Sequence, residues 1–488
     1  MRRHLVVWGI VAAVLAVWSG AAWGQASSQP ASRPAEQATT QSASVAPGAE
    51  APSDPVEEFF KKTKHPVSWF TWGADVRLRE VFTPNLLLDQ EDRHFQRYRE
   101  RVWATVSPCA DLDINTRLVY EPRHFCQPSR EAFTRDAAYI DEWTMDEAIF
   151  DQMNVEWRNI CGLPLKAKVG RQDIILGNGW LVLDGTPLDG SRTIFFDAVR
   201  GTLDLKNCQT SVDVIYIDQH ADSDWWIKPF CDKDFHNIEQ DEKGAILYVT
   251  NTSLPKTQID GYFIYKHDEA VLNAPADYVA PWQAGDNADI YAFGARAAGD
   301  IGDHWKYRAE YAAEFGNKNG QALCAQGFNS LLSYFLKDKC NNNFRVGYEY
   351  LSGDKPGTES TNEQFDPLWG RWPQFSELLV YTVALENRPG ETTNLHRVQL
   401  GWSCNPCKNL EWLNDYHLLF RDQKSYTGRP YFDQDCFRGQ LFTSVLKYKF
   451  NEHVSTHLWG EFFFPGNFYS ESRNETAAFL RYEVVFTW

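Results

Sequence analysis

Ala478-Phe-Leu-Arg-Tyr-Glu-Val-Val-Phe-Thr-Trp488 are the last eleven residues of the chain, and their side chains alternate in character. Every second position from 478 to 488 is apolar, whereas Arg481, Glu483 and Thr487 fall on the other parity. Successive side chains of a β-strand point to opposite faces, so this period of two separates an apolar face from a polar one. The stretch predicts a membrane-spanning strand with lipid on one side and a water-filled lumen on the other.

The front of the chain predicts export. Arg2 and Arg3 precede an apolar run over residues 5–18, and Ala22-Trp-Gly24 provides a small-x-small cleavage site, so residues 1–24 are interpreted as a signal peptide. This run is shorter than the roughly 20 residues of a spanning helix, and the sequence offers no other long uncharged apolar segment. Because lipid requires backbone groups to be satisfied internally, we expect a bacterial outer-membrane barrel whose last strand, with its terminal Trp, is also the sorting signal.

Composition divides the mature chain into two parts. Residues 25–66 are rich in Ala, Ser, Pro, Gln and Thr and predict a disordered periplasmic lead, which places the N-terminus in the periplasm. Residues 67–488 are expected to form the barrel. The chain is 15% aromatic, with 19 Trp, 21 Tyr and 31 Phe, yet its mean hydropathy is only -0.46. This combination is typical of strands that face lipid with one half of their side chains and water with the other.

Turn signals divide the barrel region into about 18 strands. Short and long connections alternate, which is the asymmetry of periplasmic turns and extracellular loops. The short turns are expected near 108–111, 159–162, 206–208, 252–255, 299–302, 338–341, 404–407 and 451–452. The long loops are expected near 82–95, 122–143, 175–192, 220–242, 267–286, 316–326, 353–391, 422–437 and 465–474. The predicted fold class is all-β: a transmembrane antiparallel β-barrel with short periplasmic turns and long extracellular loops.

Arginine recurs on the polar side of the first two predicted strands. Asp75, Arg77 and Arg79 fall on one face of the first strand, and Arg97, Arg99 and Arg101 fall on one face of the second. The chain has a net charge of -17, so a basic lining predicts that something anionic passes, and the guanidinium fork suits carboxylates. The alternative is a structural ladder of arginine and carboxylate that rigidifies a wide barrel. Further lumen candidates are Arg117, Arg158, Arg200, Arg308, Arg345 and Arg397, with Asp113, Asp204, Glu310 and Glu349 among them.

Ten cysteines in an exported chain favour disulfides. Four of them lie in or beside outer loops. The Cys404-Asn-Pro-Cys407 motif is also compatible with a metal or redox pair, although the sequence has no second such motif. The other cysteines are expected to pair with one another on the periplasmic rim, and they are Cys109, Cys161, Cys208, Cys340, Cys404 and Cys407.

Several motifs occur in a fixed order across residues 70–488. They are Val76-Arg-Leu-Arg79, Arg97-Tyr-Arg-Glu-Arg101, Glu147-Ala148, Val169-Gly-Arg-Gln172, Phe196-Asp-Ala-Val-Arg200, Ser352-Gly-Asp354 and Gln364-Phe-Asp-Pro-Leu368. With this set the chain resembles the alginate export family of outer-membrane porins. The resemblance implies an 18-stranded channel with an arginine-rich constriction that exports an anionic uronate polymer. It implies positive lumen positions at Arg77, Arg79, Arg99, Arg101 and Arg171, with Glu147 as an inward acidic partner.

Two features depart from the family pattern. Asp146 stands where the founding exporter has an arginine before the acidic residue of the fourth strand, and cysteine-rich turns are not a family hallmark. The identity of the polymer is therefore open.

The expected function is an outer-membrane channel that passes an alginate-like polyuronate out of the cell. The alternative is an anion-selective porin for uptake of small anionic solutes or oligosaccharides. Expected partners are these anions, outer-membrane lipid and periplasmic export or scaffold proteins, around a monomeric barrel without cofactor or metal. The acidic balance disfavours nucleic acid.

Two further classes of function find little support in the sequence. An enzyme is not expected, because the loop residues His124, His220 and His267 lack an accompanying nucleophile motif. The acidic segments 218–224 and 286–289 resemble cation ligands but lack a full EF-hand pattern, so solvated loop charge is the simpler interpretation.

Overall fold

The computed structural model describes most of the chain from residue 55 onward. The described residues are 55–127, 143–144, 148–183, 195–221, 225–230, 238–271, 285–370, 374–382, 386, 391–425, 432 and 435–488. The expected signal peptide, most of the expected lead, and Glu147 lie outside this set.

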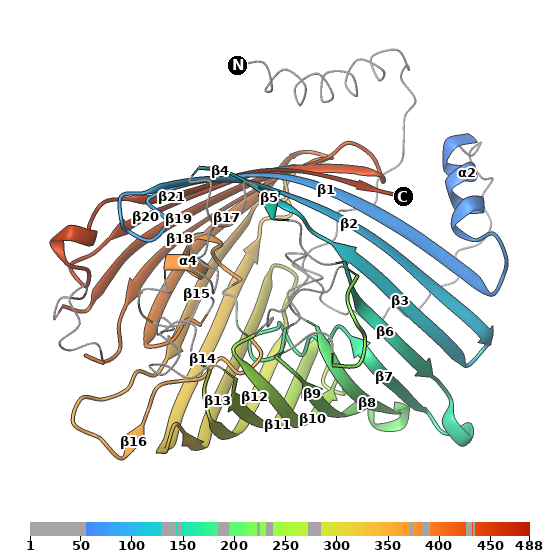
Figure 1. The fold of residues 1–488 in the computed structure, drawn as a ribbon, viewed down its shortest axis with the longest axis horizontal. Helices are drawn as coiled ribbons and strands as arrows, with labels where there is room; N and C mark the ends of the chain where they lie inside the picture. The colour runs from blue at the N-terminus through green and yellow to red at the C-terminus, as the bar shows by residue number, and fades with distance from the viewer. Residues whose placement is uncertain are drawn as a thin grey trace, which may run out of the picture. The chain divides into compact units, whose positions relative to one another are not determined.

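Eighteen long strands follow one another around a closed antiparallel barrel. Each pairs with its predecessor, and the last returns to the first through a register that runs from Asp75 opposite Thr487 to Phe82 opposite Leu480. In Figure 1 the red β21 accordingly lies beside the blue β1. The predicted 18-stranded barrel and its closing strand are therefore confirmed. The strands are β1 (Phe70–Pro84), β2 (Asp92–Cys109), β3 (Leu112–Tyr120), β6 (Ile149–Trp157), β7 (Leu165–Gln172), β8 (Phe196–Leu205), β9 (Thr210–Gln219), β10 (Gln240–Asn251), β11 (Thr257–Ala270), β12 (Ala288–Ile301), β13 (Trp305–Lys318), β14 (Gln321–Phe335), β15 (Asn343–Leu351), β17 (Leu395–Cys407), β18 (Leu410–Phe420), β19 (Phe437–Lys449), β20 (Val454–Pro465) and β21 (Ala477–Thr487).

Shorter elements supplement this ring. Strand β4 (Arg123–Gln127) continues along β2 beyond the end of β3, and β5 (Trp143–Thr144) pairs with β4. Strand β16 (Thr361–Asn362) pairs in parallel with β14. The helical segments are α2 (Pro55–Lys64), α4 (Leu378–Thr382), η1 (Ile160–Gly162), η2 (Lys206–Cys208) and η5 (Glu471–Arg473). No helix among the described residues is long and apolar enough to cross a membrane.

The faces of the strands follow the predicted period of two. On β1 the side chain of Arg77 is 2% exposed, whereas that of its neighbour Leu78 is 37% exposed. On β21, Arg481 and Glu483 are buried, and Tyr482 between them is exposed. Glu100 lies on the outer face of β2 without disturbing this alternation. On these strands the buried residues line the interior.

Two of the predicted connections are wrong in their limits. Strands β13 and β14 are joined only by Asn319 and Gly320, both with positive φ, and not by the long loop expected at 316–326. Asn-Gly between alternating strands is the preferred dipeptide of a two-residue hairpin turn. Cys404 to Cys407 belong to β17, where the register shifts, and the turn itself is formed by residues 408–409.

Helix α2 corrects the expectation that residues 25–66 are disordered throughout. The ring of Phe60 lies 4.2 Å from that of His453 and 4.6 Å from that of Trp488, between centroids. The indole of Trp72 donates a hydrogen bond of 2.9 Å to the carbonyl of Thr63. Proline at the first helical position, acidic residues in the first turn and lysines in the last favour a helix here, and this local signal was missed.

Two non-strand segments pack against the inner faces of the strands. Residues 173–183 and 363–370 are joined by a bridge between Val182 and Trp369, and the ring of Trp180 stacks on that of Phe365 at 5.6 Å. Their apolar side chains form one cluster with Ile217, Ile246 and other inward residues of β9–β14. The hydrophobic core of the barrel thus lies inside it, between the wall and these two inner segments.

Candidate functional site

Five arginines of β1 and β2 bond to three carboxylates on the inner wall. Arg79 donates to Glu483 at 2.6 Å, Arg99 to Asp75 at 3.1 Å, and Arg101 to the same Asp75 at 3.0 Å. The two remaining arginines, Arg77 and Arg97, share Glu121. Among the residues that the structure describes, these five arginines outnumber their carboxylate partners by two.

Glu121 is the central acid of this wall, and sequence reasoning missed it. It is fully buried at the break between β3 and β4, where it accepts hydrogen bonds from Arg77 at 2.7 Å and Arg97 at 3.0 Å. The Glu-Pro dipeptide at 121–122 was the available signal, because proline cannot continue a ladder of hydrogen bonds.

The next strands hold further paired arginines. Arg117 donates to Asp151 at 2.8 Å and to Asp173, at the start of the inner segment 173–183, at 3.1 Å. Arg200 donates to Asp213 at 2.7 Å. Both arginines face the interior, as predicted. Because both arginines have carboxylate partners, these positions fit the alternative of a structural ladder of arginine and carboxylate.

Arg171 does not share the inner face. It lies in register with Met153 and Asp197 and has the parity of Val169, whose side chain is 49% exposed on the outer surface. Its guanidinium pairs with Asp197 at 2.9 Å and lies against the ring of Phe195 at 3.9 Å, which buries it completely. The register thus gives Arg171 the parity of outward-facing residues, and its place in the lumen stays a prediction.

The opposite wall carries a row of charged side chains across β11 to β17. Neighbouring strands place Arg296 beside Glu310 and Glu349 beside Arg397. Arg296 donates to Asp260 at 2.7 Å, and Arg397 donates to Glu349 at 2.8 Å. One row nearer the turns, Arg345 donates to Asp415 at 3.1 Å. The predicted inward positions Arg308, Arg345 and Arg397 thus share this wall.

Polar contacts fix the inner segments to the strands. The indole of Trp369 donates to Glu242 at 2.9 Å, and Lys318 donates to Asp366 at 2.6 Å. Burial raises the pKa of Asp366, but the ammonium groups of Lys318 and Lys266 outweigh it, so the net pKa lies below the ordinary value. Sequence reasoning missed these anchors, since a loop residue carries no periodic signal of its partner on a distant strand.

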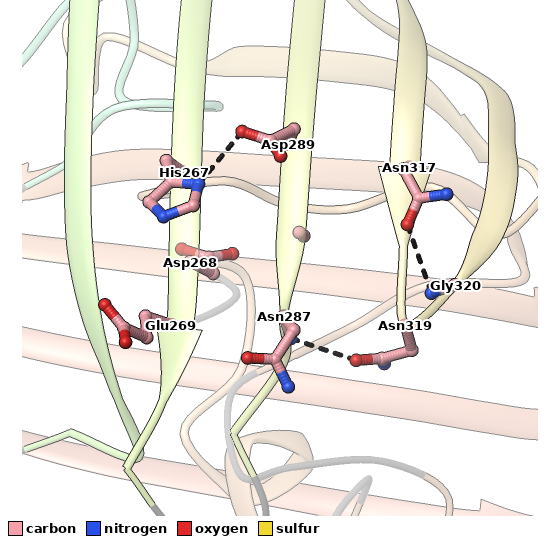
Figure 2. A pocket seen from close by; sticks show the side chains of 9 residues that line it. His267, Asp268, Glu269, Asn287, Asp289, Asn317, Asn319 and Gly320 are labelled. Atoms are coloured by element: carbon pink, nitrogen blue, oxygen red, sulfur yellow. Dashed lines mark hydrogen bonds and ion pairs between the residues drawn. The ribbon is translucent and has the colours of Figure 1, made fainter.

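A cavity of about 610 Å³ opens at the ends of β11, β12 and β13 (Figure 2). His267 and Asp289 lie 2.9 Å apart, and the side chain of Asn319 accepts a hydrogen bond of 2.9 Å from the backbone of Asn287. No cluster of three or more histidine, cysteine or acidic side chains suited to a metal ion occurs within the described ranges. Asp289 accepts a hydrogen bond of 2.7 Å from the hydroxyl of Tyr265.

The six turn cysteines are free thiols in the structure. Cys404 is buried and the other five are at least partly accessible; the backbone of Asn405 donates to the carbonyl of Cys340. The structure thus does not show the disulfides expected among Cys109, Cys161, Cys208, Cys340, Cys404 and Cys407. Turn signals assign these residues to one rim, but they do not determine which thiols face each other.

A closed barrel with an apolar exterior and a charged interior defines a channel of the outer-membrane porin type. Among solved structures of similar fold, Pseudomonas aeruginosa OccK7 (OpdD) has 10% identity and a TM-score of 0.52, covering 86% of this chain and 99% of that chain. Acinetobacter baumannii OccAB4 has 10% identity and a TM-score of 0.51 with the same coverage. P. aeruginosa OccK2 (OpdF), in complex with glucuronate, has 8% identity and a TM-score of 0.51, covering 85% of this chain and 97% of that chain.

The family model for alginate export matches residues 68–483, so the chain belongs to the alginate export family. A comparison with curated proteins finds no match. The family and the fold are those of transport channels of the outer membrane.

Proposed function

We propose that this protein is an outer-membrane channel that passes an anionic, alginate-like polyuronate out of the cell. The observation that carries the proposal is the concentration of five arginines on the inner wall at β1 and β2, within a chain of net charge -17. Family membership supports the same substrate class. In this arrangement the short turns, helix α2 and the lead face the periplasm, and the barrel acts as a monomer.

Paired arginines are compatible with transport of a polyanion. Each sugar of a polyuronate carries one carboxylate, which competes with Asp75, Glu121 or Glu483 for a guanidinium. Charge-assisted hydrogen bonds are roughly twice as strong as neutral ones, so free arginines in a row would hold a polymer too tightly. The carboxylates of the protein weaken the binding of the polymer at each arginine. Conduction needs sites that attract the polymer enough for it to enter and bind it weakly enough for it to leave.

Uptake of small anionic solutes is the second candidate. The inner segments 173–183 and 363–370 favour it, because their apolar cluster occupies part of the barrel interior and leaves less room for a polymer. One solved barrel of this fold is in complex with glucuronate, which is a sugar carboxylate of the size expected for this alternative.

Single-channel recording in planar bilayers tests both candidates. We expect anion selectivity and a current that is interrupted by oligouronates of defined length, with neutral oligosaccharides of equal length as the control. Translocation of long chains, seen as interruptions whose duration shortens at higher voltage, supports export; permanent block by long chains with passage of monomers supports uptake. Cation selectivity together with indifference to uronates would refute both.

A further inference from the structure

Arg308 on β13 lies in a row of uncharged neighbours. Its partner on β12 is Ala298, its partner on β14 is Leu331, and the next residue in the row is Gly347 on β15. Directly paired residues of adjacent strands have their side chains on the same face, about 5 Å apart. The residues beside the guanidinium are therefore small or apolar, and none of them is able to accept a hydrogen bond through its side chain.

The charged groups in the adjoining rows are already engaged. Arg296 is bonded to Asp260 at 2.7 Å, and Arg397 to Glu349 at 2.8 Å. Glu310, two residues along the same strand face, accepts a hydrogen bond of 3.0 Å from the hydroxyl of Tyr262.

The guanidinium of Arg308 has no hydrogen bond and no ion pair with any residue that the structure describes, and its Nε is buried without a partner. The other inward arginines of this wall differ: the guanidinium of Arg345, for example, reaches Asp415 past Gly401, where a Cβ would collide with both groups. A buried donor left unsatisfied costs about 1–3 kcal/mol. An acceptor supplied from the lumen is therefore expected to stabilise the guanidinium of Arg308.

We infer that Arg308 is a binding site for the carboxylate of a single uronate-type sugar residue. Its fork supplies parallel donors to both oxygens of one carboxylate, and Leu331 offers an apolar surface beside it for the sugar ring. The site rests on the proposed function and makes it specific: along a lumen of paired arginines, Arg308 is where a sugar acid binds without first displacing a resident carboxylate.

The test compares Arg308→Gln with Lys306→Gln. Both substitutions remove one positive charge from the inner face of β13, but Lys306 lies one row nearer the turn, where it approaches Asp300 at 3.9 Å. Block of single-channel current by glucuronate and by a mannuronate trimer is titrated for the wild-type barrel and both variants. Arg308→Gln is expected to weaken the block at least about tenfold, as a lost charged hydrogen bond implies, and Lys306→Gln less than about twofold.

A third variant keeps the charge and removes the fork. Arg308→Lys is expected to bind the trimer several-fold more weakly than the wild type, and it serves as the test if the glutamine variant does not assemble. If the wild type is blocked and the glutamine and lysine variants are blocked equally well, the Arg308 site is wrong while the channel function stands. If no uronate blocks the wild type, the site and the proposed function both fail.

Discussion

The ring of Phe60 in helix α2 meets the ring of Trp488 edge-on, with 4.6 Å between centroids and an interplanar angle of 76°. Trp488 also stacks on Trp72 of β1, and its backbone N–H donates to the carbonyl of Ala74 at 2.7 Å. The helix that precedes the barrel therefore covers the seam at which β21 closes onto β1.

Phe60→Ala is expected to lower the resistance of the barrel to thermal unfolding, because each aromatic pair contributes about 0.5–1.5 kcal/mol beyond burial. The midpoint of heat modification on detergent gels measures this. Phe59→Ala is the control, since Phe59 is 59% exposed and should shift the midpoint less. Equal midpoints for wild type and Phe60→Ala would show that α2 does not stabilise the seam.

Deletion of Trp488 should reduce insertion into the membrane, whereas Arg481→Ala should assemble and change only conductance. Arg481 lies on the inner face, where it pairs with Glu377 at 3.3 Å and stacks over Trp459 at 4.5 Å. Membrane fractionation followed by bilayer recording separates the two effects. Loss of assembly in both variants would remove the distinction between sorting and lumen positions.

Arg79→Gln should destabilise the barrel more than the double variant Arg79→Gln/Glu483→Gln. Breaking a buried pair from one side leaves an uncompensated charge and costs about 3–5 kcal/mol, whereas neutralising both partners does not. Denaturation in detergent measures the difference. A double variant no more stable than the single one would mean that the charge of Glu483 is compensated elsewhere, for example by Arg77 at 3.8 Å.

Neutralising three of Arg77, Arg79, Arg99 and Arg101 is expected to abolish or reverse anion selectivity, because it removes three positive charges from one wall of the lumen. Single substitutions should change flux only modestly. Reversal potentials in a salt gradient provide the measurement. A triple variant that keeps its anion preference would show that this wall does not set selectivity.

Arg171→Gln should leave ion selectivity unchanged, although it removes a buried ion pair and lowers stability. Arg171 lies on the outer face, whereas Arg200, one strand further on, faces the interior. Arg200→Gln should therefore shift the reversal potential and is the matched comparison. A larger shift for Arg171→Gln would contradict the outward placement.

Acidification tests the anchor between Lys318 and Asp366. The lowered pKa of Asp366 means that its stabilising contribution is present above the ordinary carboxyl pKa and is lost only as pH falls through the lower pKa of the folded state. The conductance change caused by Asp366→Asn should therefore be equal at pH 4 and pH 7 if this anchor holds the segment 363–370. Asp366→Asn is expected to raise conductance at both values, and an unchanged conductance would show that the segment is held without it.

The sequence by itself determined the strands, their faces and the closing of the barrel. The period of two is a local property of the backbone, so Leu78 and Arg77, or Tyr482 and Arg481, were assigned to opposite faces without knowledge of their neighbours. The same rule puts Arg308 on the inner parity of β13 and, applied from Val169, turns Arg171 outward against the resemblance. The Asn-Gly turn and the signals of α2 were also local and readable.

Only the tertiary structure decided which charges meet. Glu121 bonds to Arg77 and Arg97 because it lies at the break between β3 and β4, and Asp366 reaches Lys318 from a position 48 residues further along the chain. The strand register and the paths of the inner segments set these distances, and neither produces a periodic pattern in the sequence. The isolation of Arg308 follows from the same cause: its row depends on how four separate strands align, which no single strand specifies.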